Sequence, residues 1–480
     1  MRTKLAVAIG LALAAGQAFA VDTLFDNFTP LASSTTPPVS LAGEATTITM
    51  ATPITGNTFT ATSVRDRSSA GLPNAGNWDM ITANETGPSA GRYLFTVFED
   101  FNGPAGVQRM DTQNGYAATT IWSSPGAEGT RFTHQAFDAS YWTPWGTHIT
   151  AEESWGNGTG LSSNFGRLFE ITNPITATNT ADAQFYHRNV VPRTAHEGIQ
   201  FDAAGNMYFI DELNGGSIYK YTTAASMTDV LAGTANYFSA GTSSVLRVGN
   251  GATPNATSAF SWVAFTDANG LGLVGATTIT DENGVQSVNA RATADVAAFK
   301  GTDYQRPEDL QLQVRSDGDE LLYVTTTTTH EIYAINLTDS SVSLFANTST
   351  LDLATNAAVG GALANPDNLA LDAAGNIYII EDRAGGIDDD IWFAKDINLD
   401  GDLGDPGEGL ARWATQGTAG SEFTGLYFDK LNPNRAWVNI QHPGSGNDRT
   451  FEINAVPVPA ALPLLVSALA GLGFAGRHRK

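Results

Sequence analysis

Two stretches of this chain, 170 residues apart, are almost identical. Residues 201–212 read FDAAGNMYFIDE, and residues 371–382 read LDAAGNIYIIED. Each stretch predicts a short strand, a turn at Gly205 or Gly375, and a second apolar strand that runs into two adjacent carboxylates. A repeat of this kind is typical of a fold built from similar β units. Carboxylates at equivalent strand ends could then point to one place.

The rest of the chain predicts an all-β protein. Gly, Thr, Asn and Ser are abundant, and long helical periodicity is missing between the two termini. The strongest β patterns fall into six groups: 78–100, 142–172, 196–222, 306–337, 366–395 and 422–454. Six such units fit a six-bladed β-propeller better than a sandwich. Residues 224–300 are weakly patterned, so we expect an insertion that carries outer strands of one blade and could hang over one face.

The N-terminus predicts an export signal of residues 1–20. Arg2 and Lys4 precede an apolar run that is too short for a membrane-spanning helix, the alternative interpretation. The small residues Ala18 and Ala20 flank Phe19, which predicts cleavage after Ala20. The export machinery and a signal peptidase are the expected partners.

The C-terminus, residues 456–480, predicts a second targeting signal. It opens with Val456, Pro457, Val458, Pro459 and Ala460. An apolar run to Gly476 and a basic end, 477–480, then predict a short sorting helix that stops in the inner membrane. This tail resembles the VPLPA variant of the PEP-CTERM sorting signals, which implies processing by an exosortase-type enzyme. A permanent single-pass anchor is the alternative. Residues 21–455 remain as the propeller.

The charge of that central part excludes several kinds of partner. Without the two terminal segments the chain keeps 20 basic and 49 acidic residues, a net charge of −29. Such a surface repels nucleic acid and anionic membranes, and suits a secreted protein that binds cations. The chain has no cysteine, which excludes disulfides, thiolate nucleophiles and cysteine-ligated metals.

Acidic residues recur near the predicted strand ends. They are Glu152, Glu153, Glu197, Asp211, Glu212, Glu308, Asp309, Asp367, Glu381 and Asp382. The inner strands of a propeller converge on a central channel, where clustered carboxylates repel one another unless a cation lies among them. The sequence therefore predicts a metal site in the channel. The alternative is that each acid faces solvent or pairs locally.

A second candidate metal site is an acidic loop. Asp396, Asn398, Asp400, Gly401 and Asp402 place oxygen ligands at alternate positions, with glycine at the sharp turn. This spacing matches the start of an EF-hand-type calcium loop without the flanking helices. We expect calcium with a structural role here, and a solvated acidic turn is the alternative.

Several short motifs, taken in order, carry a family resemblance. They are Ala151-Glu-Glu153, His196-Glu197, Arg306-Pro-Glu308, Pro366-Asp-Asn368, Glu381-Asp382, Glu422-Phe-Thr-Gly425 and Asn439-Ile-Gln-His-Pro-Gly444. This order resembles that of PhoX-type alkaline phosphatases. The resemblance implies a propeller whose central site holds iron and calcium and hydrolyses phosphate monoesters. It further implies metal ligation by Glu197, Glu308 and Asp367, and phosphoryl binding by Arg306.

The chain departs from the family pattern at one position. PhoX-type enzymes typically carry a cysteine iron ligand directly before the Glu-Glu pair, where this chain has Ala151. A methyl group cannot coordinate iron, so calcium is the expected cofactor and iron is in doubt. Glu152 and Glu381 complete the set of predicted metal ligands, and Arg306 and Glu308 are the predicted catalytic residues.

These observations lead to one function and two alternatives. The expected function is that of an exported, metal-dependent hydrolase acting on small phosphate monoesters. One alternative is a non-catalytic, calcium-binding propeller of the cell surface or biofilm matrix. The other is a calcium-dependent, lactonase-like hydrolase, since a fold does not determine a reaction.

Overall fold

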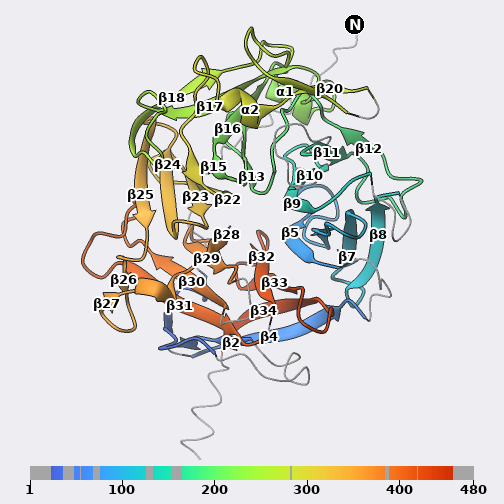
Figure 1. The fold of residues 1–480 in the computed structure, drawn as a ribbon. Coiled ribbons are helices and arrows are strands. Elements are labelled where there is room, and N and C mark those ends of the chain that lie inside the picture. The colour runs from blue at the N-terminus through green and yellow to red at the C-terminus, as the bar shows by residue number, and fades with distance from the viewer. Residues whose placement is uncertain are drawn as a thin grey trace, which may run out of the picture.

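The computed structural model forms a ring of β-sheets around a centre (Figure 1). It describes residues 23–35, 48–54, 56–68, 76–125, 133–153, 165–281, 284–383, 389–418 and 420–457. The predicted signal, with Ala20, lies outside these residues, as do Val458, Pro459, Ala460 and the rest of the C-terminal tail. In the described part of the chain no helix is both long and apolar enough to cross a membrane.

The ring consists of antiparallel four-stranded meanders, which we call blades. The first three blades follow one another along the chain. Their strands are β5 (Trp78–Ala83), β6 (Tyr93–Phe98), β7 (Gly106–Asp111) and β8 (Ala117–Ser123); β9 (Phe137–Trp142), β10 (His148–Glu152), β11 (Leu168–Ile171) and β12 (Phe185–His187); and β13 (Ile199–Phe201), β14 (Met207–Ile210), β16 (Ile218–Thr223) and β17 (Gly241–Val248).

Three further blades complete the described sheets of the ring. Their strands are β22 (Pro307–Val314), β23 (Glu320–Thr326), β24 (Glu331–Asn336) and β25 (Ser341–Ala346); β28 (Pro366–Leu371), β29 (Ile377–Glu381), β30 (Asp389–Lys395) and β31 (Gly409–Gln416); and β32 (Glu422–Phe428), β33 (Arg435–Gln441), β34 (Arg449–Pro457) and β4 (Asn57–Asp66). Each of the six sequence groups supplies strands of one blade.

The first strand of each blade faces the centre and contacts the first strand of the next blade. The contacts run from β5 through β9, β13, β22, β28 and β32 and back to β5. The ring is therefore closed, and the predicted all-β propeller is confirmed. The two similar stretches occupy equivalent places in the third and fifth blades, where each runs from the end of the first strand through the turn and the second strand.

Both stretches also form the same turn. The Asp202 carboxylate accepts a hydrogen bond of 2.7 Å from the backbone N–H of Asn206. The Asp372 carboxylate accepts the equivalent bond, of 3.0 Å, from Asn376. Gly205 and Gly375 take φ values of 83° and 87°, which glycine reaches without strain. The shared turn chemistry explains why two distant stretches have nearly the same sequence.

The last blade joins the two ends of the chain. Its outer strand β4 comes from the N-terminal part and pairs with β34 from Asp66 opposite Arg449 to Asn57 opposite Pro457. Figure 1 shows this pairing as blue ribbon beside red. Val456 and Pro457, the first two residues of the predicted sorting motif, therefore lie within the strand that closes the ring.

The apolar core lies between the blades and is rich in aromatic rings. Between the last two blades, Tyr378 of β29 packs against Phe428 of β32 with ring centroids 4.6 Å apart. Phe25, which precedes the first strand, packs against Trp413 at 5.6 Å and Phe428 at 5.4 Å. Because a propeller has no single central core, these contacts hold neighbouring blades together.

Short strands and helices lie outside the six blades. They are β1 (Phe28–Thr29), β2 (Thr49–Met50), β3 (Thr52–Pro53), β15 (Asn214–Gly216), α1 (Met227–Leu231), β18 (Ser258–Ala264), β19 (Thr278–Thr280), β20 (Gln286–Val288), α2 (Ala290–Ala294), β21 (Tyr304–Gln305), β26 (Leu351–Asp352), β27 (Ala357–Ala358) and the 3-10 helix η2 (Gly360–Ala362). Residues 224–300 carry outer strands, as expected: β18 pairs with β17 and also with β25 of the next blade.

Phe25 allows a test of this interblade packing. Its side chain is fully buried, so Phe25→Ala should lower the free energy of unfolding by about 3–5 kcal/mol, measured by urea denaturation. Ile54, which is 57% exposed, offers a nearby control, and Ile54→Ala should change this free energy by less than about 0.5 kcal/mol. Equal effects of the two substitutions would contradict the packing described here.

Candidate metal centre in the central channel

A recurring irregularity at the inner strands places acidic side chains at the centre. In the first blade two residues, Asp79 and Met80, lie opposite one residue of β6, which is a β-bulge. The same kind of register shift occurs at Asp138 in β9, Glu308 in β22 and Asp367 in β28. A bulge changes the direction of a side chain relative to the regular strand. The shared irregularity therefore brings one carboxylate from each of four blades toward the channel.

A second set of polar side chains follows the second strand of each blade. Its members are Glu99, Glu153, Glu212, Thr327, Asp382 and His442. The first and second strands of a blade are antiparallel, so the end of the second lies beside the start of the first. Both sets consequently meet at the same end of the ring.

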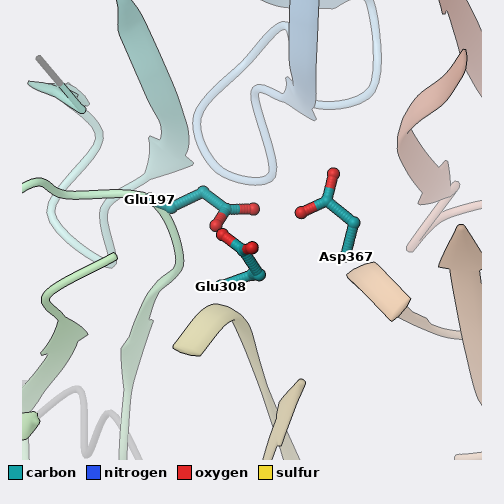
Figure 2. Close-up of side chains that lie close together, drawn as sticks. All are labelled: Glu197, Glu308 and Asp367. Atoms are coloured by element: carbon teal, nitrogen blue, oxygen red, sulfur yellow. The ribbon is translucent and has the colours of Figure 1, made fainter. Parts of the chain in front are cut away.

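Three carboxylates form the first cluster: Glu197, Glu308 and Asp367. One oxygen of each lies within 4.8 Å of the others, and Figure 2 shows the three groups pointing toward one another. The side chains come from the third, fourth and fifth blades, and Glu197 and Glu308 are almost fully buried. A second cluster, Asp367, Asp382 and Glu422, has the same spacing and shares Asp367 with the first.

Arg306 is the cation beside the first cluster. Its guanidinium lies 2.5 Å from Glu212 Oε1 through Nη2, and 3.0 Å from Glu308 Oε1 through Nε. The side chain is 38% exposed, so it also reaches solvent and can meet an anionic ligand. Its backbone N–H donates to Leu213 O at 3.1 Å, and its φ of 59° lies in the left-handed region.

Neutral side chains orient the carboxylates. Asn368 Nδ2 donates to Glu197 Oε1 at 3.0 Å, and Asn368 Oδ1 accepts from the Thr424 hydroxyl at 2.9 Å. Thr424 also bonds Asp79, and Thr327 bonds Glu308. This network links the inner strands across the channel and limits how far the acids can move apart.

The electrostatics of the channel are unfavourable without a cation. Burial raises the pKa of Glu197 well above its ordinary value, and the neighbouring carboxylates of Asp367 and Glu308 raise it further. Burial likewise raises the pKa of Asp79 to about 7. Burial and the charge of Asp79 raise the pKa of Glu99 to about 8. At neutral pH these carboxyl groups therefore retain protons, unless a bound cation takes the place of the protons.

The donor set fits a hard metal ion. Glu197 Oε2 is buried and has no hydrogen-bond partner, so an oxygen in the first cluster is available for a ligand. The clustered ligands are all carboxylate oxygens, which calcium prefers. Ala151 is buried in an apolar cluster that includes Ile149 and Ile199, and it supplies no donor. The chain therefore has acidic clusters that can bind a metal.

The structure brings together only some of the predicted site residues. Glu197, Glu308, Asp367 and Arg306 meet at the first cluster, as described above. Glu152 instead pairs with Arg167 at 2.8 Å. Glu152 and Glu153 form one of the acidic pairs at the end of the second strand of a blade. The second acid of each pair lies in the channel, because successive side chains of a strand point to opposite faces.

Glu381 and the acidic loop also lie apart from the two clusters. Glu381 accepts hydrogen bonds from Trp392 Nε1 at 3.0 Å and from the backbone N–H of Ala364 at 2.8 Å. The loop lies between β30 and β31, where Asn398 Nδ2 donates to Asp400 and to Asp405, both at 2.9 Å. Asp396 accepts from the Gly401 N–H at 3.0 Å, and the Asp402 N–H donates to Asp400. Calcium in this loop stays a prediction.

Three acids at the centre, Asp79, Glu99 and Asp138, were not expected from the sequence. The sequence does carry a signal for the acids at the inner strands. An acid follows an aromatic residue, a histidine or a proline at the start of five inner strands: Trp78-Asp79, Phe137-Asp138, His196-Glu197, Pro307-Glu308 and Pro366-Asp367. The pattern is too short to be recognised before the strand register is known.

Comparison with known protein families assigns the chain to one of them. The family model "Alkaline phosphatase PhoX" matches residues 139–444. The chain belongs to the PhoX family. The match contains the first cluster, the second cluster and Arg306, and it supports a hydrolase of the PhoX type. No curated protein matches the chain.

Solved structures show weaker similarities to this PhoX-family chain. A catalytically inactive variant of virginiamycin B lyase from Staphylococcus aureus, solved with quinupristin, is 12% identical, with a TM-score of 0.41, and covers 83% of this chain and 99% of its own. The polysaccharide lyase Uly1 is 13% identical, with a TM-score of 0.36, and covers 80% and 91%. An auxiliary nutrient binding protein from Bacteroides thetaiotaomicron is 11% identical, with a TM-score of 0.31, and covers 80% and 70%. No activity follows for this chain from similarities of this size.

The raised pKa values predict a pH dependence of stability in the chelated protein. The ordinary values are 3.8 for Asp79 and 4.5 for Glu99, so between about pH 4 and pH 8 the folded protein binds more protons than the unfolded chain. Stability should therefore fall as the pH rises across this window. Tm measured in chelator should be higher at about pH 6 than at about pH 8.5, and calcium should remove most of the difference. A chelated protein that is more stable at the higher pH would contradict the repulsion described here.

Proposed function

We propose that this protein is an exported, metal-dependent hydrolase of phosphate monoesters. Membership of the PhoX family supports the reaction class. The observation that carries the proposal is the first cluster, three carboxylates within 4.8 Å of one another, with the Arg306 guanidinium 3.0 Å from Glu308. A cation held by the acids and an arginine beside it together offer two positive groups to one phosphoryl group.

Each residue of the first cluster has a role in this proposal. Glu197, Glu308 and Asp367 would hold one cation, with calcium as the expected metal. When bound, the metal would polarise the phosphoryl oxygens and lower the pKa of a bound water. Arg306 binds a phosphoryl oxygen through the part of its guanidinium that reaches solvent, and it offsets negative charge that develops in the transition state.

Glu212 and Glu308 keep Arg306 in place for this role. Both carboxylates contact the guanidinium on the protein side, which limits the side chain to a narrow range of rotamers. A pre-oriented arginine loses less conformational entropy when the substrate binds. The substrate is a small phosphorylated molecule in this proposal.

Export is part of the same proposal. The signal at residues 1–20 would direct the chain out of the cytoplasm, and the tail at 456–480 would hold it briefly in the inner membrane until an exosortase-type enzyme acts. Val456, which opens this segment, pairs with Thr58 in the closing strand of the ring. The enzyme would thus act in the periplasm, at the cell surface or outside the cell.

Glu308→Gln tests the role of the cluster. The amide keeps the size of the side chain but removes one ligand charge, so turnover of p-nitrophenyl phosphate should fall by at least about 100-fold while the fold is retained. Glu331, a partly buried acid on β24 that bonds the Tyr333 hydroxyl, offers a matched control, and Glu331→Gln should keep its activity. Unchanged turnover in Glu308→Gln would remove this residue from the site.

Metal removal tests the reaction class separately. Chelated protein should lose phosphatase activity, and added calcium should restore it, because the carboxylates otherwise repel the substrate phosphate. The same preparations should be assayed with iron and with a lactone. Hydrolysis of the lactone alone would contradict the proposed substrate class, and no hydrolysis with any metal would favour a binding role for the propeller.

A further inference from the structure

We propose that Arg291, on the short helix α2, is a positioning residue that fixes Arg306 and Glu197 through Asp211. This inference rests on the proposed function. We call residues 285–296, which contain β20 and α2, the strap. The strap belongs to the weakly patterned insertion 224–300, and none of its side chains belongs to the two carboxylate clusters.

The strap reaches the channel through a buried ion pair. Arg291 Nε lies 2.7 Å from Asp211 Oδ2, and Arg291 Nη2 lies 2.6 Å from Asp211 Oδ1. The Asp211 side chain is 1% exposed and that of Arg291 is 7% exposed. The two parallel hydrogen bonds set both the distance and the plane of the Asp211 carboxylate. The pair therefore ties the Asp211 carboxylate to α2.

Asp211 in turn ties together two segments that carry channel acids. Its Oδ1 accepts a hydrogen bond of 2.9 Å from the backbone N–H of Ala195, two residues before Glu197. The next residue, Glu212, donates its own N–H to Ala195 O, also at 2.9 Å. Glu197 and Glu212 are thus held at a fixed separation by bonds that pass through Asp211 and Ala195.

Glu212 passes this constraint to Arg306. Its carboxylate accepts a hydrogen bond of 2.7 Å from Arg306 Nε, and the backbone N–H of Arg306 donates to Leu213 O at 3.1 Å. The strands β15 and β21 pair beside this bond, with Asn214 opposite Gln305. The backbone and the side chain of Arg306 are therefore both anchored to the segment that Asp211 controls.

The strap also contacts the chain before Glu197 directly. The backbone N–H of Arg193 donates to Val288 O at 2.9 Å, and the N–H of Ala290 donates to Arg193 O at 3.1 Å. Asn289 caps α2, because its Oδ1 accepts from the Ala292 N–H at 3.0 Å. The cap holds the first turn of the helix, from which Arg291 projects.

Stability alone does not require this arrangement. A buried ion pair contributes little compared with apolar side chains of the same size, because both charges lose their hydration. What the pair adds is a fixed geometry, since a bidentate arginine allows one orientation of its partner. The pair joins the strap to Asp211, the residue next to Glu212, whose carboxylate contacts Arg306.

The double variant Arg291→Met with Asp211→Asn tests the inference. It removes both charges of the Arg291–Asp211 pair together, and the new amide oxygen at position 211 can still accept from the Ala195 N–H. Arg435→Met with Asp429→Asn is the control, since this Arg–Asp pair spans the turn from β32 to β33, at the other end of these strands from Glu422 and His442. We expect both double variants to unfold at urea concentrations close to that of the unsubstituted protein.

The two variants should differ at the site. With calcium bound, the Arg291 double variant should show a KM for p-nitrophenyl phosphate and an inhibition constant for inorganic phosphate raised about tenfold, because Arg306 is no longer held in place. The Arg435 double variant should keep both values. Arg291→Lys, which retains the charge but not the bidentate contact, should give intermediate values. Unchanged KM and phosphate inhibition in the Arg291 double variant would overturn the inference.

Amide hydrogen exchange gives a readout that does not need activity. The amides of Glu212 and Arg306 should exchange faster in the Arg291 double variant than in the Arg435 double variant, because their acceptors lie in the segments that Asp211 joins. If these amides exchange equally in both, the inference is wrong even when the phosphatase is active. An unsubstituted protein that hydrolyses no phosphate ester would instead contradict the proposed function, and faster exchange would then still support the strap.

Discussion

Repulsion among buried carboxylates is the constraint on which the site depends. One carboxylate oxygen each of Glu197, Glu308 and Asp367 lies within 4.8 Å of the others, and burial and the charges of neighbouring carboxylates raise the pKa values of all three well above the ordinary range. Such a group is unstable as a set of separate anions. It persists when a cation, protons or a rigid scaffold offsets the repulsion. In this propeller the scaffold is the ring of inner strands, and the donor set is suited to calcium.

The scaffold resists this repulsion through packing that lies away from the channel. Aromatic contacts such as Tyr378 with Phe428 join neighbouring blades, and the pairing of β4 with β34 joins the two ends of the chain. A ring without a free junction cannot relax by separating two blades. The network from Glu197 through Asn368 to Thr424 adds hydrogen bonds across the centre. Closure of the ring is therefore linked to the geometry of the site.

The sequence allowed the fold to be predicted more completely than the site. Strand patterns and the repeated Asp-Ala-Ala-Gly-Asn turn are local signals, so the propeller could be recognised from them. Only the resemblance to a family motif indicated Glu197, Glu308 and Asp367 as candidate metal ligands. Asp79 and Asp138 were missed because a bulge, visible only in the register of two strands, directs them inward. The sequence does not indicate that Glu153, and not Glu152, faces the channel, because alternation at a strand end depends on where that strand stops.

A crystal structure of the calcium-soaked protein, with anomalous scattering recorded, tests the central claim most directly. The account predicts an anomalous peak among the carboxylate oxygens of Glu197, Glu308 and Asp367, with calcium–oxygen distances of about 2.3–2.6 Å. Glu308→Gln crystals treated in the same way should show a weaker peak or none. Calcium found only at surface acids, with the channel carboxylates bonded to water alone, would contradict a metal centre in the channel.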